Sequence, residues 1–269
     1  MHRRRFLASS LAASAMAIDA SSSYLQGGQQ ASEGNAREYY ELRRYHLQSG
    51  PQQKLTSSFV ADSLIPGLNR LGMKPVGAFD LYIGPETPSL YVLIPSTSLE
   101  TLVNAEFRLA RDEEYQKSGA LFLNAPATQP AYVRVESSLM VAFEGWPKLT
   151  VPPVTAQHGS RVFQLRTYES ATDQDHRRKV EMFNSGEFGV FQRAGFWQVF
   201  YGDTLIGSHL PNLTYMLSFP DLSEMNAKWK AFGSDPEWKK LTSSSRFNFE
   251  EIVSNITSLI LNPTSYSQI

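Results

Sequence analysis

Two segments of the chain place polar side chains at every second position, and two further tyrosines accompany them. The residues are Glu41, Arg43, Tyr45, Gln164, Arg166, Tyr168, Tyr91 and Tyr215. An arginine fixed among tyrosine hydroxyls and a carboxylate or amide can hold an anionic or phenolic ligand. Alternatively, these groups satisfy one another as buried ion pairs and hydrogen bonds, and the two further tyrosines belong to the core.

A second candidate is the densely charged run at residues 175–181. On a helix, His176 and Lys179 lie near one face, where the imidazole could serve as a general base beside a cation. Alternatively, the run is the solvated first turn of a helix. Glu187 follows a glycine near an expected helix break, which could direct its carboxylate inward.

Several kinds of chemistry are excluded or unsupported. The chain has no cysteine, so it has no disulfide, thiolate metal site or Cys nucleophile. It lacks the glycine-rich phosphate-binding motifs, the G-x-S-x-G elbow and the H-E-x-x-H zinc motif. His46, His158 and His209 stand alone, so no metal is predicted. No cofactor is predicted either, although a haem needs only one axial histidine and stays open.

An internal repeat organises these residues. Residues 40–45 (YELRRY) align with residues 163–168 (FQLRTY) at an offset of 123 residues. The same offset aligns residues 70–72 with 193–195 and residues 114–117 with 237–240, and Tyr91 meets Tyr215 with one residue of slippage. A period this long indicates two domain-sized copies.

Each copy is predicted to have the order β-α-β-β-α-β. The expected strands are 39–46, 74–83, 90–94 and 132–143 in the first copy and 161–169, 196–202, 213–219 and 252–261 in the second; the expected helices are 52–71, 98–117, 175–194 and 222–241. This is the split ferredoxin-like arrangement. The predicted fold class is therefore α+β, with two tandem ferredoxin-like domains at residues 37–150 and 151–269. The bare sheet faces of the two domains can cover each other, which gives a single-chain pseudo-dimer.

The alternation along the first strand of each copy predicts where its side chains point. We expect Leu42 and Leu165 to face the helices. The alternate polar residues would then point into the space where the two sheets meet, and a ligand would lie in the barrel between the two halves.

The composition and the net charge of the chain limit the classes of binding partner that we expect. Hydrophobic residues make up 42% of the 269 residues and the formal net charge is -1. A chain this apolar can build a core, and a near-neutral chain has no global electrostatic footprint for nucleic acid. We expect a small-molecule ligand, no nucleic-acid partner, and either a monomeric pseudo-dimer or a homodimer.

The sequence of the N-terminus predicts an export signal. Residues 3–7 (RRRFL) match the twin-arginine pattern, and a short, alanine-rich apolar run follows. Residues 1–20 are predicted to be this signal and residues 21–36 a flexible linker. The mature chain is then expected to be periplasmic or secreted, without an integral membrane segment.

These motifs resemble the NIPSNAP family. The opening YELRRY is similar to the start of that family, and Trp229 followed by residues 235–238 (DPEW) is similar to its other signature. The resemblance covers about residues 38–269 and is weaker in the first copy, where residues 111–115 (RDEEY) replace the DPEW block. It implies a dimeric α/β-barrel, a fold shared with cofactor-independent quinol monooxygenases, haem-degrading enzymes and stress-response proteins.

Two functions from different classes follow. The first is an exported NIPSNAP-like protein that binds a small ligand and has no assigned catalysis. The alternative is a cofactor-independent monooxygenase-like or haem-handling enzyme of the barrel type. A structural or interaction module is a third possibility, which a broad exposed apolar patch would favour. Because the signature is stronger in the second copy, the site is expected to lie nearer that copy.

Overall fold

The computed structural model describes residues 36–269. The predicted signal at 1–20, and the predicted linker except for its last residue, lie outside the described residues. No helix among residues 36–269 combines the length and the apolar character that a bilayer crossing needs.

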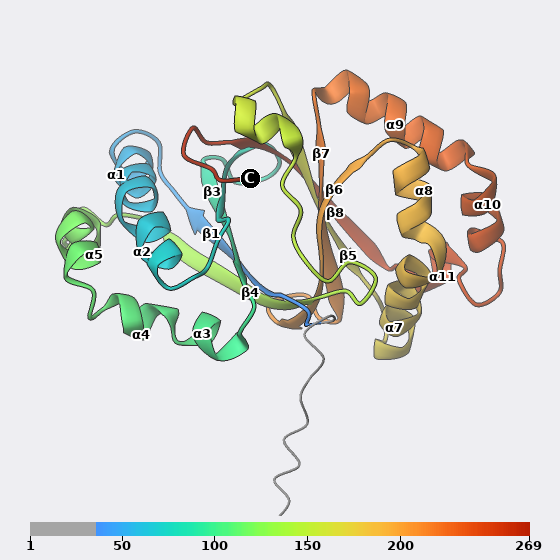
Figure 1. The fold of residues 1–269 in the computed structure, drawn as a ribbon, viewed down its shortest axis with the longest axis horizontal. Helices are drawn as coiled ribbons and strands as arrows, with labels where there is room; N and C mark the ends of the chain where they lie inside the picture. The colour runs from blue at the N-terminus through green and yellow to red at the C-terminus, as the bar shows by residue number, and fades with distance from the viewer. Residues whose placement is uncertain (1–35) are drawn as a thin grey trace, which may run out of the picture. The chain divides into compact units, whose positions relative to one another are not determined.

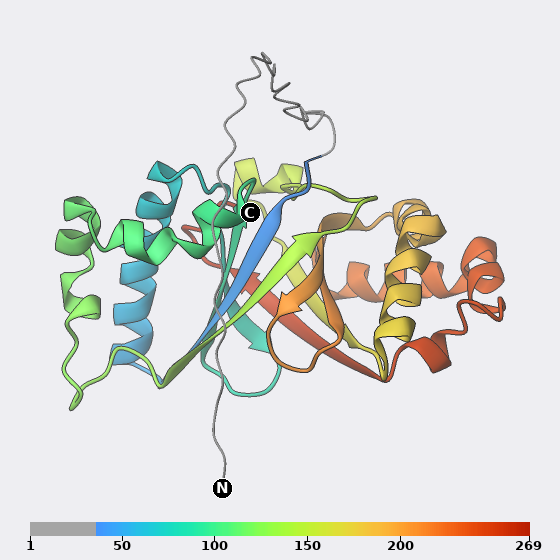
Figure 2. The same ribbon diagram turned by 90° about the horizontal axis from the view of Figure 1, so that it is seen from below.

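Eight strands close into one antiparallel barrel in the order β1-β3-β2-β8-β5-β7-β6-β4 (Figures 1 and 2). The strands are β1 (Tyr39–His46), β2 (Gly77–Ile83), β3 (Ser89–Ser96), β4 (Arg134–Ala142), β5 (Val162–Glu169), β6 (Trp197–Ile206), β7 (Asn212–Phe219) and β8 (Asn255–Pro263). Each half therefore contributes four strands, in the orders β4-β1-β3-β2 and β8-β5-β7-β6. The predicted mixed α/β barrel is confirmed at this level.

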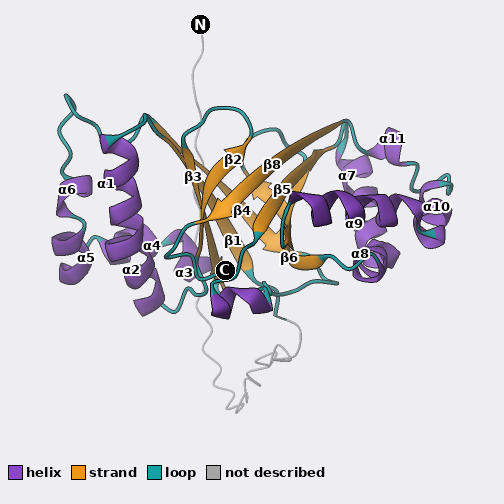
Figure 3. Ribbon diagram, turned by 90° about the horizontal axis from the view of Figure 1, so that it is seen from above, coloured by secondary structure: helices purple, strands orange, loops and turns teal. Residues whose placement is uncertain are grey.

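Helices cover the barrel from two sides (Figure 3). The first half supplies α1 (Pro51–Phe59), η1 (Val60–Leu64), α2 (Ile65–Arg70), α3 (Leu99–Val103), α4 (Ala105–Leu109), α5 (Glu113–Ser118) and α6 (Ala120–Leu123). The second half supplies α7 (Asp173–Met182), η3 (Phe183–Glu187), α8 (Phe188–Arg193), α9 (Leu222–Ser234), α10 (Pro236–Thr242) and α11 (Phe249–Ile252). The turn η2 (Pro153–Gln157) lies between the halves.

The long helices that the sequence predicts are broken. Residues 52–71 form α1, the π-helical segment η1 and α2, and residues 175–194 form α7, the π-helical segment η3 and α8. Gly186 has non-helical dihedral angles inside η3, so the expected break at this glycine is confirmed. The start of the last predicted strand is wrong, because α11 occupies residues 249–252 and β8 begins at Asn255.

The offset of 123 residues recurs in the observed structure. It relates β1 to β5, β3 to β7 and η1 to η3, residue for residue. It also relates two ion pairs that tie a helix end to the cap of a later helix: Arg70 with Asp112, and Arg193 with Asp235. Both aspartates accept hydrogen bonds from the first turn of the following helix, as N-cap residues do.

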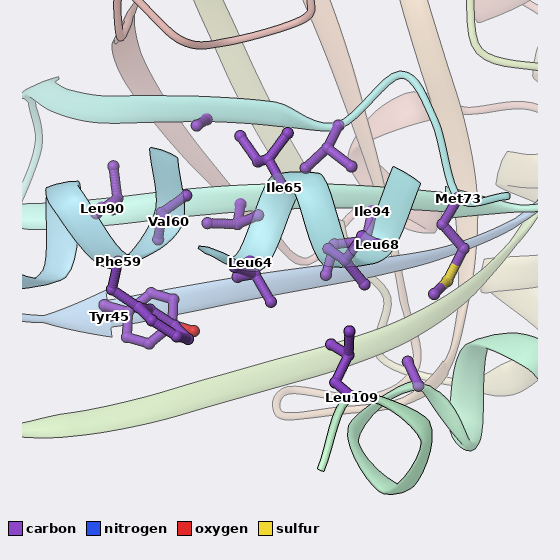
Figure 4. Packing of buried hydrophobic residues seen from close by; sticks show 14 of the residues in the cluster. Tyr45, Phe59, Val60, Leu64, Ile65, Leu68, Met73, Leu90, Ile94 and Leu109 are labelled. Carbon is purple, nitrogen blue, oxygen red and sulfur yellow. The ribbon is translucent and has the colours of Figure 1, made fainter. Parts of the chain in front are cut away.

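Three apolar clusters fill the fold. One cluster lies inside the barrel. Each half has one further cluster, between its strands and its helices. In the first half, Leu64 of η1 and Leu68 of α2 belong to the same cluster as Phe59 and Tyr45 (Figure 4). The barrel interior collects apolar residues such as Phe79, Phe163 and Met216. Both faces of the strands are thus buried.

The predicted direction of the side chains of β1 and β5 was wrong. Leu42 and Leu165 pack in the barrel interior, whereas Tyr45 and Tyr168 belong to the clusters under the helices. The prediction assumed that only the helix-covered face would be apolar. An eight-stranded barrel has an interior that side chains must fill, and leucine supplies that filling here. The polar residues therefore face the helices, and the barrel interior is not their ligand space.

The two halves join through the pairs β2–β8 and β4–β6. Both ladders are short and contain a register shift. At the second junction, Gly202 in β6 lies so close to β4 that an added Cβ would be 2.9 Å from the Cβ of Met140. A side chain there would push the two halves apart.

Candidate functional site

In the first half, the predicted polar residues neutralise one another. Arg43 makes a bidentate contact with Glu41, with Nε–Oε1 and Nη2–Oε2 distances of 2.9 and 3.0 Å. Its Nη1 lies 2.8 Å from Glu106 Oε1 and donates to the Tyr45 hydroxyl at 3.3 Å. Burial alone would lower the pKa of Arg43, but Tyr45 and the two carboxylates raise it well above its usual value. This guanidinium has its full complement of partners.

The second half has an equivalent arginine, Arg166, with different neighbouring residues. Arg166 Nε donates to the Tyr168 hydroxyl at 3.3 Å, and the Tyr215 hydroxyl lies 2.8 Å from that of Tyr168. The guanidinium also lies over the Trp229 ring, 4.6 Å from its centroid. The Trp229 indole N–H donates to Gln164 Oε1 at 2.7 Å. We call these five residues the Arg166 cluster.

The offset of 123 residues makes the two arginines directly comparable. Gln164 stands where the first half has Glu41, and Trp229 stands where it has Glu106. Both acidic partners of Arg43 are therefore replaced by uncharged residues. Arg166 is partly buried, and no carboxylate of residues 36–269 forms an ion pair with it. The neighbouring tyrosines outweigh burial and keep its pKa above the usual value, so the cation is retained.

A buried ion pair lies behind the Arg166 cluster. Lys179 Nζ lies 2.5 Å from Glu187 Oε2, and the two side chains are 0% and 1% exposed. The ammonium also lies over four aromatic rings, at 4.3 Å from Phe183 and between 5.0 and 5.7 Å from Phe249, Tyr168 and Trp238. Burial lowers the pKa of Lys179 and raises the pKa of Glu187, and each partner opposes the other's shift. The pair is costly to bury.

The first half has no such pair. At the same offset it carries Thr56, which donates to the Ala131 carbonyl at 2.8 Å, and Leu64, which is fully buried. The fold thus accommodates an apolar packing at this place. Lys179 and Glu187 are not needed to form the helix layer, which points to another role for them.

His176 pairs with a residue that the sequence did not single out. Its Nε2 lies 2.7 Å from Asp203 Oδ1, in β6. His176 is buried, and it lies on the same face of α7 as Lys179, one turn earlier. The predicted face is therefore correct, but the alternative of a solvated turn is not, because both side chains point inward.

The predicted site residues fall into separate groups. Six of them lie together beneath the helices of the second half: Gln164, Arg166, Tyr168, Lys179, Glu187 and Tyr215. Tyr91 packs inside the barrel, where burial raises its pKa to about 12. It shares no space with Tyr215. The strand register pairs Arg43 with Val92 and Arg166 with Tyr215, so the slipped alignment of Tyr91 with Tyr215 was wrong.

Two functional candidates escaped the sequence prediction. The sequence singles out Trp229 only as part of a family signature, yet its indole binds Gln164 and covers Arg166. The repeat offset of 123 residues, applied to Glu106, leads to Trp229 and would have shown that an indole replaces a carboxylate there. Asp203 lies in a strand with no motif around it, and only the fold brings it to His176.

Metal ligation finds no support in the described part of the chain. Residues 36–269 contain no group of three or more His, Asp or Glu side chains arranged to hold a metal ion. His46 instead lies between Glu86 and Glu136, at 2.8 and 3.1 Å.

The comparison with protein families decides the classification of the second half. The NIPSNAP family model matches residues 161–268. These residues are a NIPSNAP domain. The Arg166 cluster and the Lys179–Glu187 pair both lie within it. No curated protein sequence matches the chain.

Solved structures share the fold at low sequence identity. A "putative monooxygenase" from Fusobacterium nucleatum has a TM-score of 0.56 at 9% identity, over 85% of this chain and 93% of its own. A protein of the same name from Lactobacillus acidophilus has a TM-score of 0.54 at 7% identity, over 84% and 94%. A NIPSNAP-like domain protein from Burkholderia xenovorans covers 41% of this chain and 90% of its own, at 19% identity and a TM-score of 0.37. The first two likenesses show the barrel fold alone.

Proposed function

We propose that the NIPSNAP domain binds a small anionic or phenolic ligand at Arg166. The ligand lies between the sheet and the helices of the second half, not in the barrel between the halves, because the barrel interior is apolar. One observation carries the proposal: Arg166 has lost both of the acids that neutralise its counterpart Arg43.

An unpaired, partly buried guanidinium is unfavourable in the free protein. Removing a cation from water costs free energy that an opposite charge must offset. In the first half Glu41 and Glu106 provide that charge. In the second half a ligand oxyanion would provide it, through the planar hydrogen-bonding fork that suits carboxylate and phenolate groups. The proposal thus explains why two acids are replaced at the same arginine.

The residues around Arg166 indicate which chemical groups the ligand should have. Trp229 offers an aromatic surface, and the Tyr168–Tyr215 hydroxyl pair offers a donor and an acceptor. A flat molecule with one anionic oxygen and one hydroxyl fits this set. We therefore choose 4-hydroxybenzoate as a probe, with its neutral analogue 4-hydroxybenzyl alcohol as the control.

Restoring the missing acid tests the proposal. Gln164→Glu reproduces the Glu41–Arg43 arrangement with little change of shape. We expect 4-hydroxybenzoate to change the fluorescence of Trp229 in the wild type, and Gln164→Glu and Arg166→Met to weaken its binding by about tenfold or more. Arg43→Met is the matched control in the first half and should bind as the wild type does. Equal binding by wild type and Gln164→Glu would refute the proposal.

A second candidate function is a cofactor-independent monooxygenase-like reaction at the same place. Lys179 lies beside Tyr168, and burial lowers the pKa of its amine, which is the direction that a base for a phenol proton needs. Such a reaction would need dioxygen as oxidant and an oxidisable ligand such as a hydroquinone. Oxygen uptake with hydroquinone that is lost in Lys179→Met but kept in Thr56→Val would support it. A haem-handling role has no comparable support.

The architecture of the chain supports a finer description, which we also propose. Residues 37–150 and 151–269 are two tandem ferredoxin-like domains that form a pseudo-dimer in one chain. The strand orders β4-β1-β3-β2 and β8-β5-β7-β6, and the recurring offset of 123 residues, support it. We further propose export by the twin-arginine route to the periplasm or the exterior, from the RRRFL motif. Edman sequencing of the exported chain would test that route.

A further inference from the structure

An open hollow of about 360 Å³ lies beside α7 and η3, and its lining includes no residue of the Arg166 cluster. Arg177, Val180 and Glu181 of α7 and Asn184 of η3 form its helical wall. The remaining lining residues are Arg37, Phe143, Glu144 and Asp203. The hollow is large enough for a small organic molecule.

Asp203 is held in place at the edge of this hollow. Its Oδ1 lies 2.7 Å from Nε2 of His176, which is 8% exposed. A buried imidazole is a rigid support, so the carboxylate keeps one orientation and leaves its other oxygen for a ligand. At the repeat offset the first half keeps an aspartate, Asp80, but has the exposed Gln53 in place of His176. The supporting histidine is particular to the second half.

The lining of the hollow carries two arginines, Arg37 and Arg177, and three acids, Glu144, Glu181 and Asp203. Both oxygens of Glu181 are held by Arg246, at 2.9 and 2.6 Å. Arg37 and Arg177 are exposed, and neither forms an ion pair with any of residues 36–269. Glu144 is exposed as well and forms no ion pair within this range, and Arg37 donates a hydrogen bond to the Ala142 carbonyl at 3.4 Å. The hollow thus presents two guanidiniums without a carboxylate partner, an oriented carboxylate and the half-buried side chain of Val180.

We propose that this hollow is a second ligand site, which binds the zwitterion of a free amino acid with an apolar side chain. Its carboxylate is bound by Arg37 and Arg177, and its ammonium by Asp203, which His176 positions. The apolar side chain packs on Val180. Both charged groups are recognised at once, and each has an oppositely charged partner ready in the free protein.

Calorimetric titration of the full chain with L-leucine tests this site. We use 4-methylpentanoate, which lacks the ammonium, and isoamylamine, which lacks the carboxylate, as matched probes. We expect L-leucine to bind at least about tenfold more tightly than either probe, because each deletion removes a charge-assisted hydrogen bond. The absence of L-leucine binding, or equal binding of 4-methylpentanoate, would overturn the proposal.

Variants assign the binding to the hollow. Asp203→Asn and Arg177→Met should each weaken L-leucine binding by about tenfold, whereas Asp80→Asn in the first half should leave it unchanged. Arg177 is exposed, so its variant tests the site even where Asp203→Asn fails to fold. Unchanged L-leucine binding by Arg177→Met would overturn the assignment. Arg166→Met should bind L-leucine normally, so this test is independent of the 4-hydroxybenzoate site.

Discussion

At the scale of the residue, the two halves serve as controls for each other. Arg43 and Arg166 occupy equivalent positions, yet only Arg43 has acidic partners. Lys179 and Glu187 occupy the positions of Thr56 and Leu64, yet only the second half buries charge there. Because one chain contains both versions, the polar groups of the second half cannot be a requirement of the fold. The proposed ligand site would explain them.

The buried pair makes a prediction about stability. Lys179→Met should lower the free energy of unfolding by about 3 kcal/mol, because it leaves the Glu187 carboxyl buried without its partner. The double variant Lys179→Met, Glu187→Leu should recover most of that loss, since the first half packs Leu64 at the equivalent place. Urea denaturation of both variants measures this. A double variant that loses the sum of the two single losses would contradict it.

The same variant should also change the pH dependence of stability. Burial raises the pKa of Glu187 in the folded state, and Lys179→Met removes the cation that opposes the rise. A carboxyl with a raised folded pKa favours folding below its unfolded pKa of about 4.3, and this contribution is lost as pH rises through the folded value. The loss in Lys179→Met should therefore grow as pH rises above about 4.3 in urea titrations. A loss that is constant over this range would show that Glu187 is not the cause.

At the scale of the element, short helices are fixed at their ends by local charge. Arg193 and the backbone N–H groups of Trp238 and Glu237 lower the pKa of Asp235 to about 2. The dipeptide Asp235-Pro236 predicted this cap because aspartate at the N-cap and proline at the next position are typical of a helix start. The break between α3 and α4 at Asn104 was not predictable in the same way, because no proline, glycine or side-chain cap marks it.

A substitution at Asp235 can separate the effect of its charge from the effect of its N-cap hydrogen bonds. Asparagine caps helices as well as aspartate does, so Asp235→Asn removes mainly the ion pair with Arg193. An aspartate with a lowered folded pKa stabilises the fold above its unfolded pKa of about 3.9, and the contribution disappears as pH falls towards about 2. We expect the wild type to melt above Asp235→Asn at neutral pH and the two to converge in acid. Parallel melting curves at all pH values would contradict this.

At the scale of the whole described fold, closure of the barrel links the halves. The interior cluster takes Phe79 and Leu93 from the first half and Phe163 and Met216 from the second. Neither half alone can cover this apolar face. The short β2–β8 and β4–β6 ladders hold the halves together. A half without its partner would expose both the face and two strand edges.

Separation of the halves should therefore produce a dimer. We expect residues 151–269, expressed alone, to pair with a second copy and bury Phe163, Leu165 and Met216 between them. Size-exclusion chromatography with light scattering measures the mass. A stable monomer of this fragment would show that the barrel interior does not drive the association.

The sequence allowed more of the fold than of the site to be predicted. The repeat, the strands and the Asp235 cap could be recognised because each depends on neighbouring residues or on a fixed offset. The direction of Arg166 could not be, because Leu42 and Leu165 are apolar and both faces of their strands are buried. Alternation then fixes which residues share a face but not which face is inside. Asp203 could not be found because its partner His176 is joined to it only by the fold.

Native mass spectrometry of the protein purified from its own host tests the central claim, that Arg166 binds a small anion, most directly. We predict a mass above that of the polypeptide by one small anionic or phenolic molecule in the wild type and in Arg43→Met. That added mass should be absent from Arg166→Met and reduced in Gln164→Glu. An adduct that persists unchanged in Arg166→Met, or a wild type that carries none and binds no 4-hydroxybenzoate, would contradict the claim.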